Sequence, residues 1–447
     1  MRRIALGLIG LALGSYIVWD RVEAHRLSRA IDTIPVSEGL VVKAWSLSAP
    51  ATAEQREAAS LYAQAAELAY ERDSSENHRA ARLDVDAPGG TEIPLDEIRA
   101  NYRGNDPAMP LLDRATSMDF HGFETEQRGK SPFGSIADRR LSSHLELGLA
   151  ALGSLACLRA DLASISGDAD TAVAALVPCI RLQRTLLNEQ PRSFHGVRIL
   201  GSLRIFFRHT APSDTELATL QHAIESWPEE DPMLRTAVLD RALFVEMARG
   251  QPPNGVGFSL ERVIFHPFDL ASARRALPTF DEAIVIAQRP WPERWSAVEQ
   301  QQMRFRAQQV ERYQRPPGPV ALLTDRFGMP FAWTIISLRQ SAYELAARRI
   351  AALAIAVERD RRAHNGVVPA SVTAPEDPFS GQPLVFRRDS RGYVIYGLDT
   401  NRKDDGGLLY GFGAAPQTYI GPQSPRDFGI RIPVTPGLPA SRLSPRS

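Results

Sequence analysis

Residues Asn365–Gly407 read NGVVPASVTAPEDPFSGQPLVFRRDSRGYVIYGLDTNRKDDGG, and within this stretch the sequence pattern changes from helix to strand. The preceding residues, 331–364, form the longest helical pattern of the chain, because apolar residues recur there at helical spacing. Asn365-Gly366 is a typical helix end, since both residue types readily adopt the left-handed backbone conformation. We therefore expect a long helix that stops at Asn365.

Two short β-type runs follow this helix. They cover residues 384–386 and 393–396, and the turn-forming residues 387–392 separate them. The pattern predicts a β-hairpin, and the Pro-rich tail beyond Tyr410 is expected to add an edge strand. Together the helix and the hairpin predict a small α+β module over residues 331–435.

The rest of the chain is predicted to be mainly helical. Capping boxes predict three helix starts, at Thr52/Gln55, Ser213/Glu216 and Thr279/Glu282. Further helical patterns cover residues 109–118, 138–165, 169–190, 197–207, 232–250 and 299–314. The loops between the central helices are short, which favours antiparallel neighbours in a helical hairpin bundle or an open array. The predicted fold class is mainly α, with the small α+β module at the C-terminal end.

The length of the chain, 447 residues, suggests two or three domains at ~150 residues each. The predicted layout is a membrane anchor at 1–20, a helix and an irregular crossing segment at 21–136, a helical body at 137–320, the α+β module at 331–435 and a disordered tail at 436–447. Lys+Arg and Asp+Glu each total 52, so no net charge attracts nucleic acid over long range. Nucleic acid is therefore not an expected partner.

The N-terminal sequence predicts export. Arg2 and Arg3 precede an uncharged apolar run at residues 4–19. By its length alone, this run fits both a short membrane span and the apolar region of a cleaved signal peptide.

Two features favour an anchor that is not cleaved. Tyr16 and Trp19, which prefer the membrane interface, end the run, and the nearby small-residue cleavage pattern, Val22-Glu23-Ala24, lies several residues beyond it. We expect a single-pass protein of the bacterial inner membrane that contacts the bilayer through residues 4–19. Its N-terminus is expected in the cytoplasm and the bulk of the chain in the periplasm.

The chain has two cysteines, Cys157 and Cys179, which excludes a disulfide scaffold or a cysteine-rich metal site. Each lies eleven residues from Asp168, in the predicted turn between two helices, so an antiparallel hairpin brings them to similar height. A disulfide and two ordinary buried thiols both fit this placement. Packed helix axes are ~8–10 Å apart, whereas a disulfide needs Cα atoms within ~7 Å, and Pro178 is expected to kink the second helix.

The C-terminal sequence resembles the globular end of the major pseudopilin of type II secretion. The similar elements are NGVVP at 365–369, DPFSGQP at 377–383, GYVIY at 392–396 and DTNRKDDGG at 399–407. The similar region, Ile350–Gly407, covers about an eighth of the chain. The predicted anchor lacks the processed glycine and the nearby glutamate of a pseudopilin, so the resemblance does not imply pilus assembly. As a whole, the chain resembles single-anchor bacterial proteins with a helical body, a family without an assigned activity.

The resemblance also implies a calcium site, because the acidic loop of pseudopilins binds calcium. The matching residues are Asp399, Asn401, Asp404 and Asp405. Carboxylate, amide and backbone oxygens are the ligands that calcium prefers. The alternative is a loop in which Asp, Asn and Gly only form turns.

The sequence contains no GxSxG, HExxH or GxGxxG motif that would indicate a reaction. We therefore expect a membrane-tethered binding or structural protein with partners in the cell envelope. The alternative is an envelope hydrolase whose site is assembled from distant residues. Its expected contributors are His78, His121 and Glu124, because long irregular segments often hold functional residues.

Overall fold

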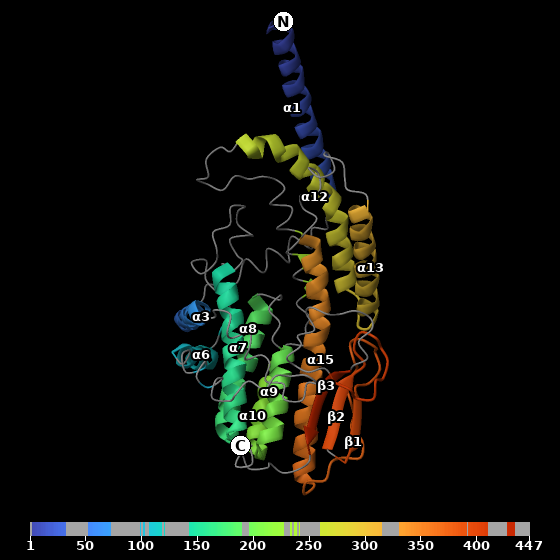
Figure 1. The fold of residues 1–447 in the computed structure, drawn as a ribbon. Helices are drawn as coiled ribbons and strands as arrows, with labels where there is room; N and C mark the ends of the chain where they lie inside the picture. Colours follow the sequence, from blue (N-terminus) through green and yellow to red (C-terminus); the bar gives the residue numbers. More distant parts are fainter. Residues whose placement is uncertain are drawn as a thin grey trace, which may run out of the picture. The chain divides into compact units, whose positions relative to one another are not determined.

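The computed structural model describes residues 2–32, 52–72, 107–118, 143–189, 196–227, 260–314, 330–390, 392–409 and 427–433, with residues 99, 102, 120, 233, 234, 237, 238 and 241 in addition. In these residues the protein has ten α-helices and one three-stranded antiparallel sheet (Figure 1). The prediction of a mainly helical protein is confirmed.

The chain forms two compact units. The first comprises Met1–Pro50, Arg128–Arg140 and Pro232–Arg339, and the second comprises Ala51–Gln127, Leu141–Asp231 and Gln340–Ser447. The division falls within the longest helix, α15 (Pro330–Ala363), between Arg339 and Gln340.

The second unit contains most of the helices. Besides α15 from Gln340 onward, they are α3 (Ala53–Arg72), α6 (Ala108–Ser117), α7 (Ser143–Ile165), α8 (Ala169–Glu189), α9 (Gly196–His209) and α10 (Asp214–Glu225). Helix α7 is central, because α3, α8 and α9 all pack against it. The apolar residues Leu145, Leu149 and Leu152, which the sequence places on one stripe, are all buried.

Helix α7 also contains a segment, Leu147–Ile165, with the length and apolar character of a membrane span; it is the one such segment found in the described part of the chain. Of this segment, 67% is buried inside the protein. Most of its residues are thus covered by the rest of the protein, although Leu147 is exposed.

Two of the predicted capping boxes are present. Gln55 N donates to Thr52 Oγ1 at 3.2 Å and Thr52 N donates to Gln55 Oε1 at 2.9 Å. Ser213 caps α10 in the same way, since Glu216 N donates to Ser213 Oγ at 3.3 Å and Ser213 N donates to the Glu216 carboxylate. These bonds satisfy amide groups that a helix start otherwise leaves unpaired.

The predicted helix start at Thr279 is wrong. Helix α12 (Leu260–Ala287) runs without interruption through Pro267 and Pro278, so Thr279 and Glu282 lie inside it. A proline in a helix removes one backbone hydrogen bond. Packing against α1 (Arg2–Asp32) and α13 (Glu293–Gln314) in the first unit offsets this cost.

The C-terminal module has the predicted hairpin and the predicted extra strand. Strands β1 (Val385–Asp389), β2 (Gly392–Gly397) and β3 (Phe428–Pro433) form an antiparallel sheet in the order β1-β2-β3. Strand β2 is therefore central and all of its residues are buried, while the tail strand β3 lies at an edge. The turn between β1 and β2 is shorter than the sequence indicates, because both strands extend into residues 387–392.

Helix α15 packs against this sheet (Figure 1). The ring of Tyr343 lies 4.9 Å from the ring of Phe379 and 5.3 Å from that of Phe428, measured between centroids. The helix ends as predicted: Asn365 and Gly366 have φ values of 56° and 85°, and Gly366 N donates to Arg361 O at 2.7 Å. This end turns the chain back toward the sheet.

Several predictions fall on residues that the structure does not describe. The predicted irregular segment at 73–136 is described only at residues 99, 102, 107–118 and 120. The tail at 436–447 and most of the predicted helix at 232–250 also lie outside the described residues.

Candidate functional site

The candidate site is the acidic loop at residues 399–407, which follows the central strand β2. Its first residue is held by the helix beneath the sheet: Tyr343 OH, on α15, donates to Asp399 Oδ1 at 2.7 Å. Asp399 is buried and has a φ of 51°. A second link joins the same helix to the sheet, because Tyr393 OH on β2 donates to Glu358 Oε1 on α15 at 2.8 Å. The start of the loop is thus fixed relative to α15.

The DPFSGQP motif supports the same end of β2. The buried carboxylate of Asp377 accepts hydrogen bonds from Ser380 Oγ at 2.6 Å and from Ser380 N and Leu398 N at 3.2 Å each. A side chain at Gly397 would collide with it, since a Cβ there would lie 2.6 Å from Asp377 Oδ1. Asp377 therefore connects its own turn to the residue that precedes the acidic loop.

The other three predicted calcium ligands also take part in hydrogen bonds around the loop. Asn401 Nδ2 donates to Asp405 Oδ2 at 2.7 Å. Asp404 Oδ1 accepts from Tyr396 OH and from Gly406 N at 2.8 Å each. The Arg387 guanidinium, from β1, pairs with the other oxygen of Asp404.

Asp427 is a further acidic residue that contacts the loop from the start of the tail strand, and the sequence pattern does not predict it. It is fully buried just before β3, and it accepts from Gly407 N at 2.8 Å and Asp405 N at 3.4 Å. A β-bridge between Leu409 and Asp427 places Asp427 next to the loop. No local sequence pattern predicts this contact, because it depends on how the tail strand β3 pairs with β2.

The loop carboxylates influence one another. Burial raises the pKa of Asp427 to about 6; the amides of Gly407 and Asp405 oppose this shift, and the charges of Asp405 and Asp404 add to it. Burial also acts to raise the pKa of Asp404, but bonds from Tyr396 and Gly406 and the Arg387 charge bring it below its ordinary value. The loop thus concentrates negative charge that Arg387 partly balances.

These oxygens are of the type that calcium binds, but most already accept hydrogen bonds from the loop. Among the described residues, no three His, Cys, Asp or Glu side chains are grouped so that they could hold a metal ion. An ion bound at Asp404 would compete with Arg387 for the same carboxylate. Calcium at Asp399, Asn401, Asp404 and Asp405 stays a prediction.

A second polar centre lies between α8, α9 and α15. The buried carboxylate of Glu344 accepts from Gly196 N at 2.9 Å and from Gln183 Nε2 at 3.1 Å. Gly196 is the first residue of α9, so Glu344 caps this helix. Burial raises the pKa of Glu344 to about 8. The sequence pattern does not predict this role, because a single glutamate inside a helical pattern carries no distinctive signal.

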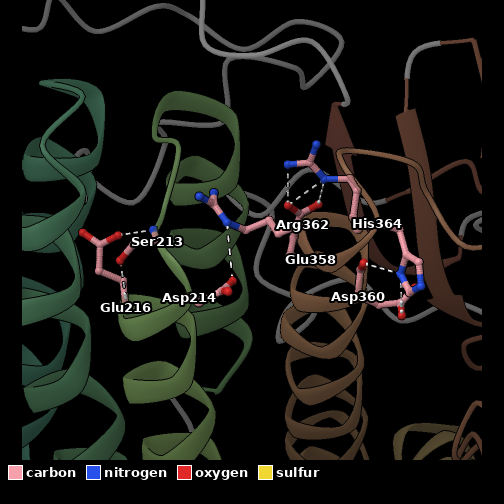
Figure 2. Close-up of polar contacts among 8 residues, drawn as sticks. Ser213, Asp214, Glu216, Glu358, Asp360, Arg362 and His364 are labelled. Carbon is pink, nitrogen blue, oxygen red and sulfur yellow. Dashed lines mark hydrogen bonds and ion pairs between the residues drawn. The ribbon is translucent and has the colours of Figure 1, made fainter.

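A third set of polar contacts joins the end of α15 to the start of α10 (Figure 2). Arg362 Nε lies 3.6 Å from Asp214 Oδ1, and His364 Nδ1 lies 3.3 Å from Asp360 Oδ1. The side chains of these two pairs are between 32% and 74% exposed, and such pairs contribute little to stability. They indicate a solvated surface.

The remaining predicted site residues are the two cysteines and the three residues of the hydrolase alternative. Cys157 and Cys179 lie on α7 and α8, both buried and both free thiols. His78, His121 and Glu124 lie outside the described residues. The hydrolase alternative therefore gains no support from the described geometry.

Comparison of the chain with protein-family models, with curated proteins and with solved structures found no match. Its class is thus defined by the fold alone: a mainly helical protein whose longest helix carries a three-stranded sheet and an acidic loop.

Proposed function

We propose that the protein is anchored in the bacterial inner membrane by residues 4–19 and extends into the periplasm. There it serves as a binding or structural protein of the envelope. The C-terminal module, which resembles a pseudopilin end, is the part proposed to be presented to envelope partners.

The observation that carries the proposal is the change in burial along α1. Large apolar side chains are exposed in its first part; Leu11 is 72% exposed, and Leu13, Ile17 and Val18 are also exposed. Leu27, near its other end, is only 1% exposed. An apolar helix surface of this kind is stable in contact with lipid and is costly in water.

The contacts of α1 also support an anchor that remains attached. Glu23 is buried and accepts from Arg26 Nη1 at 2.9 Å and from Arg274 Nε, on α12, at 3.2 Å. Cleavage after Ala24 would divide α1 and leave Arg274 without this carboxylate. Glu23 and Leu27, on the two sides of this alternative cleavage position, are thus both buried in the first unit.

Membrane fractionation tests the anchor. The full chain is expected in the carbonate-resistant membrane fraction with its N-terminus intact by mass spectrometry, and its bulk accessible to protease added from the periplasmic side. The double variant Leu13→Arg/Ile17→Arg should lose membrane retention, because an arginine near the centre of a span, such as at Leu13, costs roughly 2.5–3.5 kcal/mol, and a second charge at Ile17 shortens the apolar run. The control His25→Arg adds a charge beyond the apolar run and should stay in the membrane. A soluble wild-type chain would refute the anchor.

A separate experiment tests the binding role. Crosslinked membranes containing the full chain should yield the same protein partners in repeated pull-downs, and a chain truncated after His364 should lose those that contact the module. Absence of any reproducible partner would count against the binding role while leaving the anchor intact.

A further inference from the structure

The two cysteines lie on neighbouring helices of one hairpin. The turn at Ser166, Gly167 and Asp168 joins α7 to α8, and Asp168 caps α8 by accepting from Thr171 N at 3.0 Å. Cys157 and Cys179 each lie eleven residues from Asp168. Both side chains are buried, so both face the packed interior of this unit.

The contact between α7 and α8 involves small side chains. Buried alanines lie within two helical turns of each cysteine: Ala156 and Ala160 near Cys157, and Ala172 and Ala175 before Cys179. Small residues allow helix axes to approach toward the lower end of the usual ~8–10 Å range. Because Cα atoms lie ~2.3 Å from the axis of their helix, two Cα atoms that face each other across such a contact can lie within the ~7 Å that a disulfide needs.

The two thiols influence each other. Burial raises the pKa of Cys179 well above its ordinary value, and the neighbouring Cys157 thiol raises it further. Cys179 Sγ donates to Ala175 O at 3.3 Å, so its side chain lies along the surface of α8. Pro178 does not interrupt this arrangement, because α8 continues through it.

We propose that Cys157 and Cys179 form a disulfide that joins α7 to α8 in the exported protein. One S–S bond forms here as one S–S bond of an oxidising thiol–disulfide partner breaks. The two cysteines give up two electrons and two protons, and the partner becomes a dithiol. Because both thiols are buried in the folded chain, the exchange occurs during folding, before the hairpin is covered. The periplasm is an oxidising compartment that contains such partners, so this step rests on the proposed function.

Refolding tests the pair without depending on location. The full chain is reduced, unfolded, and refolded in detergent with a mixture of reduced and oxidised glutathione. Alkylation under denaturing conditions should then label neither cysteine, and mass spectrometry should find the peptides of Cys157 and Cys179 linked. The single variants Cys157→Ala and Cys179→Ala should each keep one thiol that is labelled or carries glutathione. Two labelled thiols in the folded wild type would overturn the proposal.

Thermal unfolding supplies a second readout. The oxidised wild type should unfold roughly 5–10 °C above the reduced wild type, because the bridge restricts the unfolded chain. The double variant Cys157→Ala/Cys179→Ala should show no effect of reductant. An equal response in both chains would exclude a bridge between these residues.

Trapping in cells links the pair to location. Cells that contain the wild type are quenched with an alkylating reagent, which traps the thiols in their state in the cell. In a second strain, Ser166→Cys adds an exposed cysteine to the double alanine variant. Labelling of this cysteine by an impermeant maleimide shows on which side of the membrane it lies. Residue 166 labelled from outside, together with a bridged wild type, is the expected result. External labelling with two free thiols in the wild type would overturn the disulfide. Failure of external labelling would instead contradict the proposed function.

Discussion

At the scale of single residues, Asp377 has the largest predicted effect on the C-terminal module. Asp377→Ala removes the acceptor of Ser380 N and Leu398 N and leaves these amides without their partner. We expect a loss of about 2–4 kcal/mol in the free energy of unfolding, since a buried amide that loses its partner is costly. Denaturant unfolding followed through a probe in the module measures the loss. Asp360→Ala, at an exposed carboxylate on α15, should change little.

The calcium prediction also belongs to single residues. Arg387 already pairs with Asp404, so calcium and the guanidinium compete for one carboxylate. We expect excess calcium to raise the unfolding temperature of the module relative to chelator, and Arg387→Met to increase that rise. Arg388→Met, the neighbouring change on β1, is the control. Unfolding curves that coincide with calcium and with chelator in all three chains would remove the calcium site.

At the scale of elements, the crossing of α3 and α7 depends on Gly148. A Cβ at this position would lie 2.4 Å from Ala66 O, which belongs to the backbone of α3 and cannot move aside alone. Gly148→Ala should therefore separate the two helices and lower stability by roughly 1–3 kcal/mol despite its higher helix propensity. Leu147→Ala, at the exposed neighbouring position, should have a smaller effect in the same denaturation assay. Stabilisation by Gly148→Ala would contradict this packing.

The elements show which sequence signals predict the fold. Three local signals predicted helix ends correctly: the capping boxes at Thr52 and Ser213 and the Asn365-Gly366 pair. Each forms its hydrogen bonds with atoms only a few residues away in the chain. The box at Thr279 has the same spacing, yet α12 passes through it. The difference lies in tertiary packing, since the residues before Thr279 belong to the helix that packs against α1.

The candidate site was predicted in part for the same reason. The acidic residues of the loop are close together in sequence, and the resemblance to a pseudopilin end indicated them. Their supports, Tyr343, Arg387 and Asp427, come from a helix, a strand and the tail, and sequence spacing gives no sign that they converge. Glu344 and Gln183 likewise lie far apart in the chain and meet only in the folded unit.

At the scale of the whole molecule, buried acids predict how stability depends on pH. Burial raises the pKa of Glu344 to about 8, that of Asp161 to about 7 and that of Asp427 to about 6. All three lie in the second unit. In the unfolded chain these groups titrate near 4, so between about pH 4 and pH 8 the folded state holds protons that the unfolded state has released.

The sign of the effect follows from this difference in bound protons. Because the folded state binds more protons, raising the pH through this window lowers the free energy of unfolding. We expect stability to fall from pH 5 to pH 8 by an amount on the order of a few kcal/mol and then to level off. Denaturant unfolding of the full chain at several pH values measures this slope. Glu344→Gln removes the carboxyl with the largest shift and should flatten the curve between pH 6 and pH 8, whereas Glu225→Gln, at the end of α10, should not. If Glu344→Gln retained the full wild-type slope, Glu344 would be ionised in the folded protein, held by the amide of Gly196 and the start of α9.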